Sequence, residues 1–200
     1  MERNLLSNNI GRIFTMSTTS LIILIGVILI AAMAAWGFVV QRRSTRLRSR
    51  FGPEYDSAIH EYGDRSRAER ALERRAERTE NYHIRSLSKE EQQRFNDEWR
   101  GAQARFVDDP PLAIHDADQL VCEVMKLRGY PMADFDRRAE DLSVDHPGVV
   151  RTYRAAHAIA LTEQEGRATT EDLRRAMVYY RELFDELMET HPAGITERKR

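Results

Sequence analysis

A continuous apolar run near the N-terminus is the strongest pattern in the chain. From Leu21 to Val40, twenty residues carry no charge. Twenty helical residues at about 1.5 Å each span about 30 Å, which is the thickness of a bilayer's hydrocarbon core. Because the run has no polar face, a buried helix of a soluble protein does not explain it. The pattern predicts a transmembrane helix over residues 19–41.

The same run contains the small-x-small spacing of a signal-peptidase site, in Ala32-Met33-Ala34. A signal peptide has a shorter apolar core, of about 7 to 15 residues, and the mature chain begins after its cleavage site. Here Trp36 and Phe38 continue the apolar run beyond that site without a polar break. The continuation favours an uncleaved anchor, and an exported soluble domain is the alternative.

Arginines after the apolar run predict its orientation. Five of them follow it closely, namely Arg42, Arg43, Arg46, Arg48 and Arg50. Only Arg3 and Arg12 precede it. Because positive charge concentrates on the cytoplasmic side of such helices, we expect these arginines to end the helix and the C-terminal domain to lie in the cytoplasm.

Trp36 and the five arginines are the candidate membrane-interface residues, and the lipid bilayer is the expected partner. An indole is favoured at the level of the headgroups. The arginines could also bind anionic headgroups, at about 1 kcal/mol each. A topology signal is the favoured interpretation, because positive flanks are general to such anchors. Residues 42–53 are therefore interpreted as a basic juxtamembrane segment.

Residues 1–18 form a separate N-terminal segment in this interpretation. Met16 begins the string MSTTSLIILIG, which would be a natural start for a short anchor. We therefore hypothesise that residues 1–15 are a misassigned extension. A start at Met16 would remove both upstream arginines and strengthen the predicted orientation.

A charge-rich stretch follows the juxtamembrane segment. We expect one helix from Glu54 to about Glu80, in which Gly63 is a weak point. Its second half has only a thin apolar stripe, consisting of Ala68, Leu72 and Ala76. Charged helices of this kind are usually solvated and braced by ion pairs three or four residues apart, such as Arg65 with Glu69. The pattern predicts a stalk helix and linker over residues 54–87.

Stronger amphipathic patterns predict a compact helical bundle over residues 88–189. Ser88 and Glu91 have the spacing of a capping box, which opens a helix with an apolar stripe. Further helices are expected over about 111–128, 133–142, 147–165 and 169–189, with short connections typical of antiparallel neighbours. Residues 190–200 are interpreted as a disordered tail. The predicted fold class is all-α, with one transmembrane helix, a charged stalk and a bundle.

Three strings within the predicted soluble part resemble a known family. They are RFGPEYD, ARFVDDP and DLSVDHPGVVRTYRAAHAIAL. The chain from about Arg50 to Glu189 is similar to a family of uncharacterised bacterial membrane proteins, in which one hydrophobic helix precedes a soluble helical domain. The resemblance implies a single-pass protein of the bacterial inner membrane, and it implies no activity or catalytic residue.

The candidate chemistry of the soluble part is sparse. Nucleotide-binding and protease motifs such as G-x-x-x-x-G-K and H-E-x-x-H do not occur. Histidines and aspartates gather near two of the predicted helices, at Asp108, Asp109, His115, Asp116 and Asp118 and at Asp145, His146 and His157. They could bind a metal or act as acid and base only if they converge in space. Helix capping and solvation are the favoured interpretation, so we predict no catalytic residue, metal or cofactor.

Charge and cysteine content narrow the function further. The chain is 32% charged with a formal net charge of −1, and the basic segment lacks interleaved aromatics, so nucleic acid is not an expected partner. The single cysteine, Cys122, excludes an intramolecular disulfide and is expected to be a small buried residue. We predict a membrane-anchored protein-interaction or assembly module that binds another protein or itself. The alternative is a membrane-tethered enzyme or metal protein that uses the histidines and aspartates.

Overall fold

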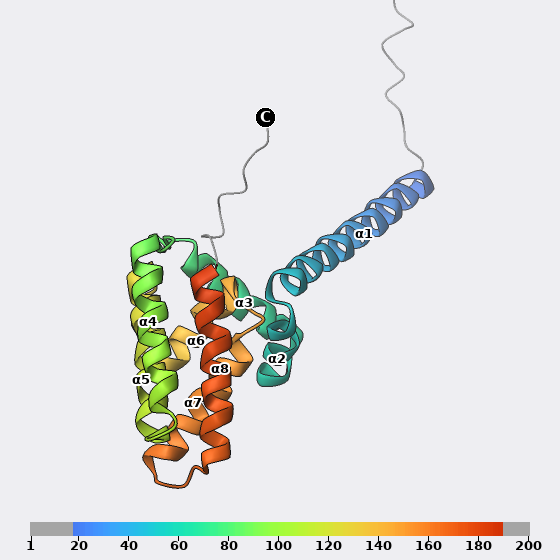
Figure 1. The fold of residues 1–200 in the computed structure, drawn as a ribbon. Helices are drawn as coiled ribbons and strands as arrows, with labels where there is room; N and C mark the ends of the chain where they lie inside the picture. The colour runs from blue at the N-terminus through green and yellow to red at the C-terminus, as the bar shows by residue number, and fades with distance from the viewer. Residues whose placement is uncertain (1–17, 190–200) are drawn as a thin grey trace, which may run out of the picture. The chain divides into compact units, whose positions relative to one another are not determined.

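The computed structural model describes residues 18–189, and within them the chain is all-α, with eight helices and no strand (Figure 1). This confirms the predicted fold class. The described chain belongs to two compact units, divided between Thr45 and Arg46. The expectations for residues 1–17, including the start at Met16, and for the tail at 190–200 lie outside the described residues.

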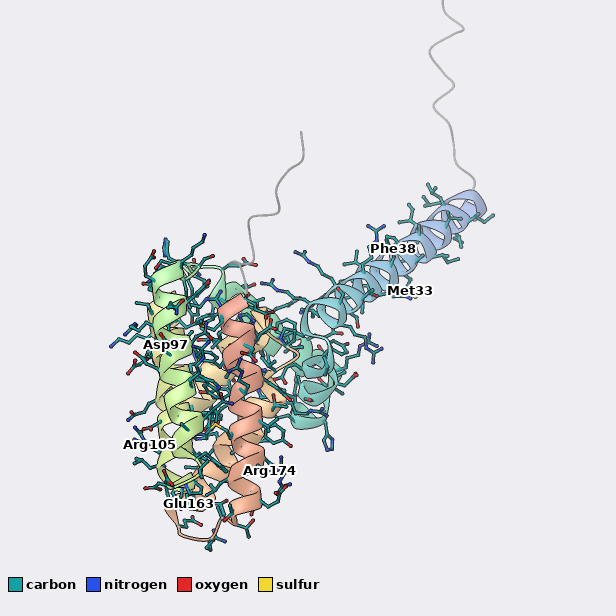
Figure 2. All side chains as sticks on the ribbon, in the orientation of Figure 1. Met33, Phe38, Asp97, Arg105, Glu163 and Arg174 are labelled. Atoms are coloured by element: carbon teal, nitrogen blue, oxygen red, sulfur yellow. The ribbon has the colours of Figure 1, made fainter. Side chains whose placement is uncertain are left out.

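The first helix, α1 (Thr18–Phe51), contains the apolar run. Its segment Leu21–Phe51 has a window of mean hydropathy 2.7 with no part of that window buried, so it is long and apolar enough to cross a membrane. Met33 and Phe38 point outward from it (Figure 2). Contrary to expectation, the arginines do not end this helix. It continues to Phe51 and stops at Gly52, whose φ of 47° favours glycine, directly before Pro53.

The expected stalk helix is instead a pair of packed helices, α2 (Pro53–Tyr62) and α3 (Arg65–Thr79). Gly63 ends α2 in a left-handed conformation, and the Asp64 side chain accepts a hydrogen bond from the Arg67 backbone N–H at the start of α3. A glycine stop followed by an aspartate cap splits the charged stretch into two helices that can fold against each other. We call α2 and α3 the juxtamembrane hairpin.

Apolar side chains of the hairpin are buried, which differs from a solvated stalk. They form a small cluster with the last turns of α1 and one residue of α6 (Phe135–Asp145). This juxtamembrane core consists of Leu47, Phe51, Tyr55, Ala58, Ala68, Leu72, Ala76 and Val144. The thin stripe of α3 is therefore sufficient to bury one face, because small alanines allow close approach of the helices.

The remaining helices form the bundle. They are α4 (Lys89–Arg105), α5 (Pro110–Arg128), α6, α7 (Val150–Gln164) and α8 (Thr170–Glu189). Helix α5 packs between α4 and α8, and α7 packs on α8 (Figure 1). Their bundle core is rich in large aromatics, and the rings of Trp99 and Phe184 stack with centroids 4.8 Å apart. Such burial is the main source of stability in a helical domain.

The segment between α3 and α4 is fixed at both of its ends. The capping box predicted at α4 is confirmed, because Ser88 and Glu91 exchange both of its hydrogen bonds. The hydrogen bond from Arg85, followed by that of the Ser88 backbone, lowers the pKa of Glu91 to about 2. The backbone N–H of Arg85 also donates to the Arg128 carbonyl at 2.9 Å. The next residue, Gly129, lies so close to this segment that a Cβ on it would be 2.5 Å from the His83 carbonyl oxygen.

Candidate functional site

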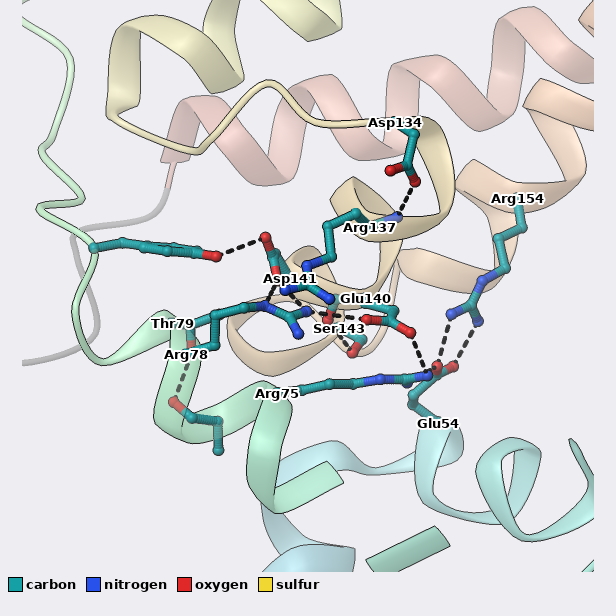
Figure 3. A network of polar contacts seen from close by, with 12 residues as sticks. Glu54, Arg75, Arg78, Thr79, Asp134, Arg137, Glu140, Asp141, Ser143 and Arg154 are labelled. Atoms are coloured by element: carbon teal, nitrogen blue, oxygen red, sulfur yellow. Dashed lines mark hydrogen bonds and ion pairs between the residues drawn. The ribbon is translucent and has the colours of Figure 1, made fainter. Parts of the chain in front are cut away.

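Buried charges lie between the juxtamembrane hairpin and the bundle (Figure 3). Six ionisable side chains from four helices bond to one another there: Glu54 of α2, Arg75 and Arg78 of α3, Glu140 and Asp141 of α6, and Arg154 of α7. We call this set the ion-pair network. Three carboxylates face three guanidinium groups, so its formal charge is zero.

Glu54 is the centre of one half of the network. Arg154 donates from Nη1 and Nη2 to the two carboxylate oxygens of Glu54, both at 2.8 Å. Arg75 donates from Nη1 to Glu54 Oε1 at 3.2 Å and from Nη2 to Glu140 Oε1 at 3.2 Å. The Glu54 and Arg75 side chains are only 3% and 4% exposed. A two-pronged arginine contact of this kind fixes the carboxylate in orientation as well as in position.

Arg78 is the centre of the other half. It donates from Nε to Asp141 Oδ1 at 2.7 Å and from Nη2 to Glu140 Oε2 at 3.0 Å. Tyr82 follows α3 in the chain, and its hydroxyl donates to Asp141 Oδ2 at 2.9 Å. Asp141 is buried, and both of its oxygens accept a hydrogen bond, which satisfies a carboxylate inside the protein.

The pKa shifts agree with a fully paired network. For Arg78, burial opposes the charge, but hydrogen bonds to Asp141 and Glu140 outweigh it and raise the pKa. The hydrogen bonds to Glu54 raise the pKa of Arg154. Burial, followed by the hydrogen bond to Asp141, raises the pKa of the Tyr82 phenol. These groups therefore keep their protons around neutral pH and act as fixed donors.

The network can hold the hairpin on the bundle, but it offers little for catalysis. Its charged atoms are occupied by one another, and it contains no thiol, imidazole or free hydroxyl nucleophile. Removing one partner of a buried pair leaves an uncompensated charge, which costs about 3 to 5 kcal/mol. The network therefore holds the juxtamembrane hairpin on the bundle, and we expect the loss of any one of its members to weaken this attachment.

Between the two groups of candidates, the charge of Asp118 acts on the His157 imidazole, while the other two histidines have different surroundings. His115 is exposed and bonds with Gln119, His146 is buried, and His157 stacks on the ring of Phe135. Within residues 18–189 no group of three or more histidine, cysteine or acidic side chains could hold a metal ion. Three of the aspartates have structural contacts: Asp109 caps α5, Asp116 pairs with Arg105, and Asp145 accepts from Tyr130.

His146 belongs to a polar cluster at the end of α6. Its Nδ1 lies 3.0 Å from Glu186 Oε1, and its Nε2 lies 3.1 Å from the Tyr130 hydroxyl. Burial, only partly offset by Glu186, lowers the pKa of the His146 imidazole. The neighbouring Arg128 is also buried and donates to the Leu187 carbonyl at 2.7 Å. This cluster ties the end of α8 to α5 and α6.

Cys122 lies in the bundle near Asp118, Arg138 and Tyr153, which all act on its thiol. Burial raises the pKa of its thiol and lowers the pKa of the His157 imidazole, so both are uncharged near neutral pH. His157 Nδ1 has no hydrogen-bond partner in the described part of the chain. A reactive thiolate needs a nearby base or positive charge that stabilises it, and here burial and the charge of Asp118 outweigh the positive charge of Arg138. The geometry supports the interpretation of Cys122 as a half-buried packing residue.

The predicted interface residues lie on the exposed surface of α1 or its last turns. Trp36 is 74% exposed, and the Arg42 guanidinium lies 4.3 Å from the centre of the Phe38 ring. Arg48 pairs with Asp56 of α2 at 2.8 Å, and Arg50 pairs with Glu80 at 3.4 Å. Arg48 and Arg50 therefore also bind the folded domain, and contact of this set with lipid stays a prediction.

Comparison with known proteins adds no family. No family model, curated protein or solved structure matches the chain. A function is therefore inferred below from the geometry of the chain's own residues.

Sequence patterns did not identify the ion-pair network. One signal for it exists, because Arg75 follows Leu72 by three residues and precedes the buried Thr79 by four, which places a charge on the buried face of α3. A charge at such a position requires a buried partner. The pattern does not indicate which carboxylate that partner is, since Glu140 lies 65 residues away.

Proposed function

We propose that the protein is a single-pass membrane protein whose helical domain binds another protein, or a second copy of itself, at the membrane surface. The domain would lie in the cytoplasm of a bacterial cell, beneath the inner membrane. The proposal combines an apolar helix of membrane-spanning length with a folded domain that begins directly after it.

One observation carries the proposal: α1 has no break between its apolar part and the folded domain. The helix is continuous from Thr18 to Phe51, and its last turns supply Leu47 and Phe51 to the juxtamembrane core. Cleavage after Ala34 would leave a mature chain with Trp36 and Phe38 exposed on a helix in water. Exposed apolar surface of that kind is unfavourable, so an intact anchor explains the helix better than a signal peptide.

A binding role is favoured over an enzyme by the character of the polar sites. The buried charges of the ion-pair network neutralise one another, and within residues 18–189 the candidate histidines and aspartates form no group that could hold a metal ion. An interaction domain needs a stable scaffold and an accessible surface, and the bundle offers both. Val107, at the turn between α4 and α5, is 83% exposed and is a natural position for a photocrosslinker.

Extraction and topology test this proposal. The full chain should stay in the membrane pellet after alkaline carbonate washing, and an alkaline phosphatase fused after Glu189 should be inactive, because that enzyme needs the periplasm. Release of a shortened chain by carbonate would contradict the anchor. An active fusion would contradict the cytoplasmic orientation.

The binding role has its own test. A photocrosslinking residue at Val107 in the membrane-bound full chain should give a defined product of higher mass, either with a second copy or with one partner. The same photocrosslinking residue at the exposed position of Arg167 serves as the control. Equal labelling at both positions would contradict a specific contact at the α4–α5 turn.

A further inference from the structure

Helix α3 presents arginines to solvent on the side opposite its buried stripe. Arg67, Arg70 and Arg74 are exposed, and their spacing of three and four residues places them on one face of the helix. We call them the α3 arginine stripe. Three other arginines of α3, namely Arg65, Arg75 and Arg78, form ion pairs with carboxylates. Arg70 donates to the Ser66 hydroxyl at 2.6 Å.

Like charges on one face make the stripe unfavourable by itself. Arg70 and Arg74 are four residues apart, a spacing at which equal charges repel and destabilise a helix. Glu73 and Glu77 lie beside the stripe and reduce this repulsion, but arginines outnumber them. An anionic surface would convert the repulsion into attraction.

Charge is distributed unevenly between the two parts of the folded chain. Residues 42–80 contain eleven arginines and eight acidic residues, whereas residues 81–189 contain fifteen basic and twenty-two acidic residues. The overall net charge of −1 hides this contrast. An anionic membrane would attract the first part, whose positive excess comes from the five arginines at 42–50, and would repel the second.

The hairpin also lies close in the chain to the predicted membrane boundary. Ala68 and Leu72 of α3 pack with Leu47 of α1 in the juxtamembrane core. Leu47 follows Val40, the last residue of the apolar run, by seven residues, which is about 10 Å of helix. Charges act over about 8 to 10 Å at physiological salt, and headgroups extend the bilayer beyond its hydrocarbon core. Only a short stretch of chain therefore separates the hairpin from the predicted membrane boundary.

We propose that the α3 arginine stripe binds the anionic headgroups of the membrane and lays the juxtamembrane hairpin against the lipid surface, with the acidic bundle turned away. This inference rests on the membrane anchor proposed above. Guanidinium groups donate paired hydrogen bonds to phosphate oxygens, which suits lipid phosphates. Each arginine near an anionic surface strengthens binding about fivefold.

The experiment uses the full chain in lipid nanodiscs with a fluorophore on α3. The fluorophore is attached at S66C in a C122A background, and the discs contain a lipid whose headgroup carries a nitroxide quencher. Discs of phosphatidylcholine alone are compared with discs that contain phosphatidylglycerol in addition. A second fluorophore position, Q93C on α4, reports on the bundle.

The proposal predicts strong quenching at position 66 in the anionic discs, weaker quenching in the neutral discs and little quenching at position 93. High salt should reduce the quenching at position 66. The variant R67Q/R70Q/R74Q should reduce it to the level of neutral discs. The matched variant R94Q/R100Q/R174Q removes the same number of exposed charges from α4 and α8 and should leave it unchanged.

The outcomes separate this inference from the proposed function. Quenching at position 66 that is equal in both lipids and insensitive to salt would overturn the lipid contact, and neither comparison requires the stripe variant to fold. Equal effects of the two triple variants would overturn the assignment to α3. Failure of the full chain to enter discs would contradict the anchor itself, and this inference with it.

Discussion

The two cores of the folded domain are built on different principles. The bundle core fills its interior with large rings such as Trp99, Tyr153 and Phe184, all fully buried. The juxtamembrane core has eight members, three of them alanines, and is flanked by the buried charges of the ion-pair network. Apolar packing within the bundle stabilises the first core without help from ion pairs. The second is held in place by contacts that fail when one partner is lost.

From this difference we expect the two cores to have different roles and different local stabilities. The bundle would be a rigid body, and the juxtamembrane hairpin would be a separable connection between that body and the membrane. A small core with buried ion pairs can open without unfolding the rest, since local stability follows local burial. Substitutions in each core test whether the two parts unfold separately.

Phe184→Ala should have the largest effect, because it opens a cavity beside Trp99 in the bundle core. Loss of a buried aromatic ring costs about 3 to 5 kcal/mol. Thermal unfolding followed by circular dichroism should show a strongly lowered Tm for the whole domain. Val178→Ala on the exposed side of α8 is the control, and an equal loss there would contradict the assigned core.

Glu54→Gln should rank second and should act on the hairpin. It leaves Arg75 and Arg154 facing a neutral amide, with an expected cost of about 3 kcal/mol. Denaturant unfolding should show an early transition that precedes unfolding of the bundle. Glu61→Gln, at an exposed position of α2, should change stability by less than about 0.5 kcal/mol. A single transition with an unchanged midpoint would contradict the claim that the ion-pair network stabilises the hairpin on the bundle.

Gly129→Ala should lower stability by about 1 to 3 kcal/mol, because the glycine has a φ of 101° and its backbone lies against the His83 carbonyl. The control is Gly101→Ala in the middle of α4, where a Cβ meets nothing within 4 Å. Alanine there should raise stability by up to about 1 kcal/mol. Opposite signs in urea denaturation would confirm that position 129 needs glycine, and equal signs would contradict it.

The pH dependence should be smaller and should come from the bundle. The folded pKa of His146 is below its unfolded value of 6.5, so the unfolded chain binds the proton more readily. Stability should therefore fall as the pH drops below about 6.5 and continue to fall until the folded imidazole is protonated. His146→Gln should weaken this slope in Tm measured between pH 7.5 and 5.5. An unchanged slope would show that other groups cause it.

The bundle could be predicted from sequence because its signals are local. The capping box at Ser88, the glycine after α5 and the stripe through Phe95 and Trp99 are all read within one or two turns of helix. The apolar run was equally clear. These elements depend on residues near one another in sequence, and patterns of spacing describe such residues well.

The juxtamembrane hairpin could not be predicted in the same way. Its charged helix looked solvated, because a stripe of alanines gives a weak signal and the partners of its buried arginines lie on distant helices. The Arg154–Glu54 contact joins residues 100 positions apart. Periodicity reports which face of a helix is apolar, but it does not report which buried charges will find one another.

Hydrogen–deuterium exchange of Glu54→Gln is the most direct test of the division between the two cores. The full chain in nanodiscs would be compared with and without the substitution, with Glu61→Gln as control. The account predicts faster exchange throughout α2 and α3 and unchanged protection in α4, α5 and α8. Unchanged exchange in the hairpin, or equal acceleration in all five helices, would contradict it.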